Sequence, residues 1–131
     1  MATKVLLLVE DDPTLQRLYS RVFDEADFEV VVASDGVAIV EKASVESPDV
    51  ILMDVMMPNR NGMEALGDLK DNEETKDIPV IMLSAHEDDQ LLMQAMQMGA
   101  KRYLVKSRLD PDQVVSITRE VLGENQVPGP S

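Results

Sequence analysis

Five short apolar segments recur along the 131-residue chain, and helical periodicity fills most of the sequence between them. Three of these segments, VLLLV at 5–9, VILM at 50–53 and VIML at 80–83, contain no polar residue. Uninterrupted apolar runs of this length are typical of strands buried on both faces of a parallel sheet. FEVVV at 28–32 and YLV at 103–105 predict two further strands.

The segments between the predicted strands carry helix signals. Asp12-Pro13 and Asp110-Pro111 each place a capping side chain before a proline, which is favoured at the first helical position. We expect helices at 13–26, from 34–36 to about 43, at 63–69, from 87–89 to Gly99, and from 111 to a stop at Gly123. The side chains expected to face the core are Leu15, Leu18, Tyr19, Val22, Phe23, Ala26, Val37, Val40, Ala43, Leu91, Leu92, Ala95, Met96, Val114, Val115, Thr118, Val121 and Leu122.

This alternation of strands and helices predicts the fold class. Strands separated by helices form a parallel sheet with right-handed crossovers, so that helices cover both faces. We expect a doubly wound α/β domain with a five-stranded parallel sheet and five helices, occupying residues 1–123. Residues 124–131 contain Pro128, Gly129 and Pro130, and we interpret them as a flexible C-terminal tail or the start of a linker.

Composition narrows the possible functions. The chain has no cysteine and one histidine, which excludes disulfides, thiolate nucleophiles and multi-histidine metal centres. A net charge of -13 argues against direct binding to nucleic acid. No segment is long and apolar enough to cross a bilayer, and no signal peptide is evident, so we expect a cytoplasmic protein without a membrane partner.

Four of the predicted strands end on residues that can do chemistry. Glu10 and Asp11 follow the first strand, Asp54 ends the third, Ser84 follows the fourth and Lys106 follows the fifth. The carboxyl ends of parallel strands lie at one edge, where open α/β sheets place their ligands. Clustered carboxylates suit Mg²⁺, and lysine and serine can neutralise and hydrogen-bond a phosphoryl group. Aspartate can accept that group covalently.

The segments around these residues are similar to a known set of motifs. LVEDDP at 8–13 is similar to an acidic-pair motif, and DVILMDVMMP at 49–58 with Gly62 is similar to a phosphoacceptor motif. LSA at 83–85 and YLVK at 103–106 match the hydroxyl segment and the aromatic and lysine positions of the same family. Over residues 4–122 the chain therefore resembles the receiver domain of bacterial two-component response regulators. The resemblance implies a flavodoxin-like sheet with strand order 2-1-3-4-5, like that of the chemotaxis regulator.

The resemblance also implies roles for individual residues. Asp54 would accept a phosphoryl group from a histidine kinase or a histidine phosphotransfer protein. Asp11, Asp54 and the Met56 carbonyl would bind Mg²⁺, with Glu10 acting largely through water. Lys106 would contact the acyl phosphate. Such a domain signals by assisting its own phosphorylation and dephosphorylation, and is not otherwise an enzyme.

Three more residues take roles from the resemblance. Ser84 would supply the hydroxyl that binds the phosphoryl group, and Tyr103 would be the aromatic residue that switches. His86, together with Met56, would occupy a position that tunes the lifetime of the phosphate. One residue departs from the family, because Ser107 stands where a proline usually follows the lysine. We expect a trans Lys106–Ser107 bond, since a cis bond without proline costs about 3 kcal/mol.

Several alternatives stay open on sequence alone. A flavin-binding carrier would need a phosphate-binding loop after the first strand, where this chain has acids. An aspartate-nucleophile phosphatase would need a second acid two residues after Asp54, where Met56 stands. A pseudo-receiver that only docks, or a phosphorelay intermediate or sink, remains the alternative within the family. The downstream partner is either another protein or an output domain outside this chain, and the oligomeric state is left open.

Overall fold

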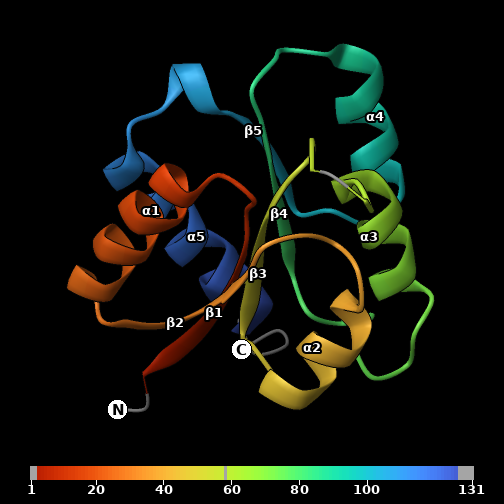
Figure 1. Ribbon diagram of the computed structural model, residues 1–131, viewed down its shortest axis with the longest axis horizontal. Coiled ribbons are helices and arrows are strands. Elements are labelled where there is room, and N and C mark those ends of the chain that lie inside the picture. The colour runs from red at the N-terminus through yellow and green to blue at the C-terminus, as the bar shows by residue number, and fades with distance from the viewer. Residues whose placement is uncertain (1–2, 58, 127–131) are drawn as a thin grey trace.

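The computed structural model describes residues 3–57 and 59–126, which form one parallel sheet with helices on both faces (Figure 1). The strands are β1 (Lys4–Val9), β2 (Phe28–Ala33), β3 (Val50–Asp54), β4 (Val80–Ser84) and β5 (Arg102–Val105). The helices are α1 (Pro13–Glu25), α2 (Ile39–Glu46), α3 (Gly62–Lys70), α4 (Asp89–Gln97) and α5 (Pro111–Gln126), with a short 3-10 turn, η1, at Lys106–Arg108.

The strands are all parallel and lie in the order β2-β1-β3-β4-β5. This order confirms the predicted doubly wound, flavodoxin-like sheet. Every residue of β3 and β4 is buried, as expected for apolar strands in the middle of a parallel sheet. The carboxyl ends of β1, β3, β4 and β5 consequently meet at one edge.

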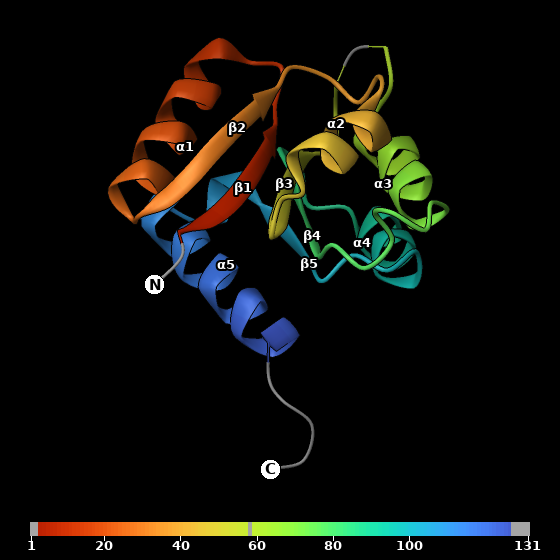
Figure 2. The ribbon, with the colours of Figure 1, turned by 90° about the horizontal axis from the view of Figure 1, so that it is seen from below.

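Two apolar cores lie on opposite faces of the sheet. Helices α1 and α5 cover one face, and α2, α3 and α4 cover the other (Figure 2). Alternate residues of each strand point to alternate faces. In β1, for example, Leu6 and Leu8 join the core under α1 and α5, whereas Leu7 and Val9 join the core under α2–α4.

Side-chain caps fix where several helices begin. The Asp12 carboxylate accepts hydrogen bonds from the amides of Thr14 and Leu15, with Pro13 at the first helical position, as predicted. Asn61 and Glu64 form a capping box at the start of α3. The Asp88 carboxylate, from the predicted run of three acids, caps α4 by accepting hydrogen bonds from the amides of Gln90 and Leu91. The three caps lie in the connections that follow β1, β3 and β4, and so they help to fix these connections at the carboxyl edge of the sheet.

The predicted start of α2 is wrong. The helix begins at Ile39, because Asp35 accepts a hydrogen bond from the Val37 amide in a local turn and Ala38 adopts a left-handed conformation with φ of 58°. Neither geometry continues an α-helix. Val37, which we expected in the core, is therefore 55% exposed, while Val40 and Ala43 pack inward as predicted.

Other predictions about the helices also need correction. Leu18 on α1 and Leu92 and Met96 on α4 are exposed, so the apolar face of each helix is narrower than its sequence suggests. The last helix does not stop at Gly123 but continues to Gln126, which places the first three residues of the predicted tail in α5. The rest of that tail, 127–131, lies outside the described residues.

One further finding concerns membranes. In the described part of the chain, no helix has both the length and the apolar character needed to span a bilayer.

Two glycines in helices should respond oppositely to alanine. A Cβ at Gly123 would meet nothing within 4 Å among the described residues, so Gly123→Ala should raise the free energy of unfolding by about 0.5–1 kcal/mol through helix propensity. A Cβ at Gly62 would lie 2.2 Å from the Asp54 carbonyl oxygen, so Gly62→Ala should lower it by about 1–3 kcal/mol. Urea unfolding measures both, and a destabilising Gly123→Ala would contradict the continuous α5.

Candidate functional site

Strand register brings the polar strand ends together. Val9 pairs with Met53 between β1 and β3, so Glu10 lies beside Asp54 one step further along. Across β4 and β5, Ser84 pairs with Val105, which places Lys106 one residue beyond Ser84. The residues that the sequence predicted at four strand ends therefore occupy one edge of the sheet.

The two-residue period of the strands divides these residues between two faces. Leu8, Leu52 and Leu104 belong to the core under α1 and α5, and Glu10, Asp54 and Lys106 each follow two positions later on the same face. Met82 and Tyr103 are in register and belong to the opposite face, under α2–α4. Ser84 follows Met82 by two positions and so shares the Tyr103 face.

Lys106 joins two buried carboxylates. Its Nζ lies 3.0 Å from Glu10 Oε1 and 3.2 Å from Asp54 Oδ2. Glu10 is 1% exposed and Asp54 is 5% exposed. Two carboxylates buried side by side would repel strongly, and the ammonium group between them offsets this repulsion.

The pKa values of this pair reflect burial and charge. Burial acts to lower the pKa of Lys106, but the hydrogen bond to Glu10 and the charges of Asp54 and Glu10 raise it above the ordinary value. The stabilisation from this shift is therefore complete below the ordinary lysine pKa and is lost only as pH rises through the folded-state value. Burial raises the pKa of Glu10, against the hydrogen bonds from Lys106 and from the Asp12 amide.

The two pKa shifts have opposite consequences for the ion pair. The raised pKa of Lys106 favours the charged ammonium group, whereas the raised pKa of Glu10 disfavours the charged carboxylate. Lys106 is positively charged at neutral pH, because its pKa is raised above an ordinary value that is already well above 7. Its ammonium group contacts both carboxylates directly. The raised pKa of Glu10 follows from burial first and from the neighbouring Asp54 charge as well. In this site, burial thus opposes the ionised form of Glu10, and Lys106 favours it.

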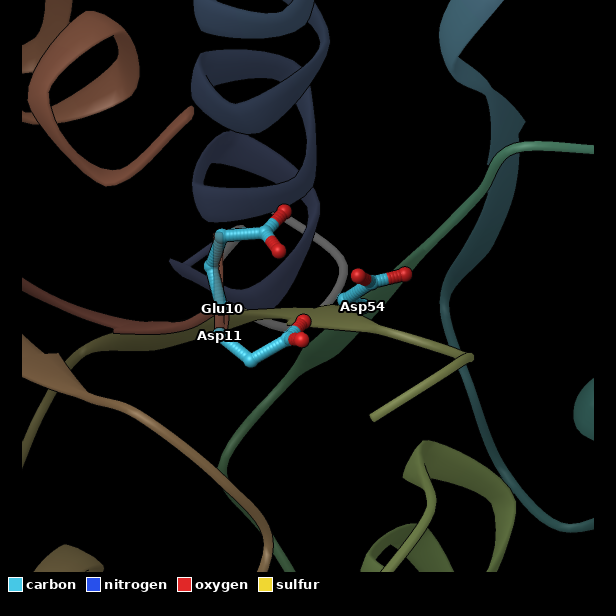
Figure 3. Close-up of side chains that lie close together, drawn as sticks. All are labelled: Glu10, Asp11 and Asp54. Carbon is cyan, nitrogen blue, oxygen red and sulfur yellow. The ribbon is translucent and has the colours of Figure 1, made fainter. Parts of the chain in front are cut away.

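Asp11 completes the cluster from the exposed side. One carboxylate oxygen from each of Glu10, Asp11 and Asp54 lies within 4.8 Å of the others. Figure 3 shows the three side chains close together, with Glu10 and Asp11 following β1 and Asp54 at the end of β3. Three carboxylates with an exposed member form a donor set that fits a hard divalent cation such as Mg²⁺.

The loop after β3 approaches the same cluster. The Met56 amide donates a hydrogen bond of 3.2 Å to Asp54 Oδ1, and Met56 is 63% exposed. Gly62 allows α3 to begin directly against the Asp54 carbonyl. Pro58, part of the motif quoted above, lies outside the described residues.

Ser84 and Tyr103 lie on the other face of this edge. The Ser84 hydroxyl donates to the His86 carbonyl at 2.8 Å and accepts from the His86 amide at 3.1 Å. His86 itself is exposed in the loop after β4. The Tyr103 hydroxyl oxygen is buried without a hydrogen-bond partner among the described residues. A buried unpaired hydroxyl carries an unfavourable desolvation free energy, although the Tyr103 ring packs against the core under α2–α4.

The Lys106–Ser107 peptide bond is trans, as predicted. Among the described residues, no peptide bond is cis. Residues Lys106–Arg108 form the η1 turn. Arg108 in this turn forms an ion pair with Glu87, so the loop after β5 touches the loop after β4. Both partners are largely exposed, which limits the contribution of this pair to stability.

Sequence reasoning did not identify two side chains that hold the site loops. Arg60 binds Asp68 through two nitrogens, at 2.8 Å and 2.7 Å, and fastens the β3–α3 loop to α3. Gln16 on α1 donates to the Glu10 carbonyl. The signal for Gln16 was its place one turn after the Asp12 cap, on the side of α1 that faces the acidic loop.

This fold and this site define a class of protein: doubly wound α/β domains with an acidic cluster, a hydroxyl and a lysine at the carboxyl edge of the sheet. The family model for the response regulator receiver domain matches residues 6–119. The chain belongs to this family, as its motifs predicted.

Relatives and solved structures agree with this assignment. The transcriptional regulatory protein CpxR of Klebsiella pneumoniae is 37% identical over 112 residues, which cover 86% of this chain and 47% of CpxR. The chemotaxis protein CheY4 of Vibrio cholerae has a TM-score of 0.84 and 28% identity, covering 92% of this chain and 99% of that one. The BeF3-activated N-terminal receiver domain of Klebsiella pneumoniae RstA has a TM-score of 0.81 and 29% identity, covering 90% and 97%.

The length of the relatives sets a limit on what they imply. The chain spans about half the length of the transcriptional regulators that it matches, and less of a hybrid histidine kinase. The matches do not extend to the remaining segments of those relatives. The activities of those whole proteins therefore do not transfer to it directly.

Replacing Lys106 with methionine should destabilise the protein strongly. Glu10 and Asp54 would then be buried without their cation, which typically costs about 3–5 kcal/mol. Urea unfolding in EDTA measures the loss. Arg108→Met, which breaks an exposed pair, should cost less than about 1 kcal/mol.

The double variant Lys106→Met/Glu10→Gln separates charge from packing. Removing the Glu10 charge should restore part of the stability that Lys106→Met loses, because one of the two unpaired carboxylates is gone. If Lys106→Met alone proved as stable as the wild type, the central role of this ion pair would be contradicted.

Proposed function

We propose that Asp54 accepts a phosphoryl group from a histidine kinase or a histidine phosphotransfer protein, and that this switches a surface read by another protein. The observation that carries the proposal is the Asp54 carboxylate at the end of β3, 3.2 Å from the Lys106 ammonium and within the three-carboxylate cluster. A carboxylate oxygen attacks phosphorus, the bond from phosphorus to the donor's leaving atom breaks, and an acyl phosphate forms.

Lys106 and the acidic cluster have complementary tasks in this proposal. Lys106 would keep its contact with Asp54 and neutralise an oxygen of the incoming phosphoryl group. Asp11, Asp54 and the Met56 carbonyl would hold Mg²⁺, with Glu10 acting through water. When bound, Mg²⁺ would balance the charge that the carboxylates and the phosphoryl group bring together.

Ser84 and Tyr103 would convert phosphorylation into a change of surface. The Ser84 hydroxyl would leave the His86 carbonyl and donate to a phosphoryl oxygen. Tyr103 would change its packing between β5 and α4, and so alter the surface formed by α4, β5 and α5. The phosphate need supply only the free-energy difference between the two packings, about 5.5 kcal/mol for a nearly complete switch.

Met56 and His86 would set how long the phosphate lasts. Both are exposed beside the site, and the proposed contacts to Asp54 and to Mg²⁺ do not use their side chains. They can therefore affect the approach of water to the acyl phosphate without being needed for its formation. These roles rest on the positions of the two residues in the family motifs.

The partners of the domain follow from the same chemistry. A phosphodonor must present a phosphohistidine to the edge of the sheet, in the cytoplasm where such kinases act. The output is either a separate protein or a further domain of a longer protein.

Phosphorylation should depend on both Asp54 and a divalent cation. Incubation with acetyl phosphate and Mg²⁺ should add one phosphoryl group, detected by intact-protein mass spectrometry. The addition should disappear in EDTA, because the charge of the acyl phosphate is otherwise unbalanced among Glu10 and Asp11. Asp54→Asn should abolish it, whereas Asp77→Asn, at a surface remote from the cluster, should not. Modification that survives in EDTA or in Asp54→Asn would refute the proposal.

The switch should be visible by NMR with a phosphoryl mimic. Beryllium fluoride with Mg²⁺ should shift amide signals between residues 84 and 106 as well as signals beside Glu10, Asp11 and Asp54. Ser84→Ala should reduce the shifts near Tyr103 while those near Asp54 remain, because the hydroxyl connects the two faces. Shifts confined to the carboxylate cluster would instead identify a phosphate acceptor or sink without this switch.

A further inference from the structure

Each of the four polar atoms of Glu10 takes part in a hydrogen bond. Its amide donates to the Ala33 carbonyl at 3.0 Å, and its carboxylate accepts from the Asp12 amide and from Lys106. The remaining polar atom, the Glu10 carbonyl oxygen, accepts from the side-chain amide of Gln16. A carbonyl oxygen can only accept, so the Gln16 atom that faces it is the nitrogen.

The hydrogen bond from Gln16 to the Glu10 carbonyl restrains the backbone next to Asp11. The Glu10 carbonyl belongs to the peptide group that links Glu10 to Asp11, and a peptide group is planar. Fixing its oxygen therefore fixes the plane from which the Asp11 side chain departs. Asp11 is the exposed member of the carboxylate cluster, so its direction depends on the backbone more than on packing.

Gln16 also connects the acidic loop to the rest of the site edge. Its nitrogen lies 3.3 Å from the Ser34 hydroxyl in the β2–α2 loop. The next residue, Asp35, accepts from Asn59 in the β3–α3 loop at 3.2 Å. Side chains thus join the loops that follow β1, β2 and β3, and Gln16 is the first member of this series.

A neutral side chain suits this position. Lysine or arginine could donate the same hydrogen bond, but its positive charge beside Glu10 and Asp11 would compete with a divalent cation. Glutamate would place an acceptor against the carbonyl oxygen and add repulsion. Glutamine supplies the donor without either effect, and it is half-buried between α1 and the loop.

We infer that Gln16 is a positioning residue for the metal-binding carboxylates: its hydrogen bond to the Glu10 carbonyl sets the direction of Asp11 and so the affinity of the cluster for a divalent cation. This inference rests on the proposed function, because it concerns the cation that phosphorylation of Asp54 requires. Gln16 touches neither Asp54 nor the reacting phosphoryl group in this scheme. Its loss should therefore weaken cation binding and spare the reaction at saturating Mg²⁺.

The test variant is Gln16→Met, which keeps the length and neutrality of the side chain and removes its donor. The matched control is Thr75→Val, which removes another side-chain donor, the Thr75 hydroxyl bound to the Leu69 carbonyl at 2.7 Å. Thr75 lies between α3 and the start of β4, at the opposite edge of the sheet from the cluster. Both changes are uncharged, so they leave the electrostatics of the cluster alone.

The first measurement is the initial rate of phosphorylation by acetyl phosphate as a function of Mg²⁺ concentration. Gln16→Met should raise the Mg²⁺ concentration for half-maximal rate about five-fold, the effect of one lost hydrogen bond, with the saturated rate unchanged. Ser34→Ala should give a smaller change in the same direction. Thr75→Val should leave the half-maximal concentration unchanged.

The second measurement is amide hydrogen exchange without metal. Gln16→Met should speed exchange at Asp11 and Asp12, and Thr75→Val should not, even where the two variants are equally stable. If Gln16→Met changes neither the Mg²⁺ dependence nor this exchange, the inference is overturned. If wild-type phosphorylation proves independent of Mg²⁺, the proposed function fails, and the exchange data alone decide whether Gln16 positions the loop.

Discussion

The structure of the site depends on one cation held between two buried carboxylates. Lys106 comes from the end of β5, Glu10 from the end of β1 and Asp54 from the end of β3, so a single ammonium group connects three of the five strands. Without it, the repulsion between Glu10 and Asp54 would oppose the register that brings them together. In the proposed function, the same ammonium group would already be in place to contact an incoming phosphoryl group.

The two-residue period of the strands places the proposed reacting residues and the proposed switch residues on different faces of the sheet. Glu10, Asp54 and Lys106 continue the face under α1 and α5, whereas Ser84 and Tyr103 continue the face under α2–α4. In the proposed function, a signal that begins at Asp54 would therefore have to cross the edge of the sheet to reach α4. Ser84 would carry it in that proposal, since its hydroxyl donates to the His86 carbonyl and a phosphoryl oxygen would be a stronger acceptor.

Much of the fold and most of the site were predictable from local sequence pattern. The buried strands at 50–53 and 80–83, the Asp12 cap and the polar residues at the strand ends follow from apolar runs and capping chemistry. Because parallel strands share one carboxyl edge, the meeting of Glu10, Asp54 and Lys106 was predictable as well. The strand order came from the resemblance of the motifs, which periodicity alone does not supply.

The amino-acid sequence by itself determined which segments are strands, which helices are capped and which residues the site edge carries, because these depend on neighbours a few positions away. Only the tertiary structure decided that α2 begins at Ile39, that α5 continues through Gly123, and that Gln16 donates a hydrogen bond to the Glu10 carbonyl. The start of α2 depends on the turn at Asp35, which Asn59 from the β3–α3 loop also contacts. The continuation of α5 depends on the open space around Gly123, and the Gln16 hydrogen bond depends on how α1 packs against the loop that precedes it. The structural roles of Gly123 and Gln16 depend on the residues that surround them in the folded protein.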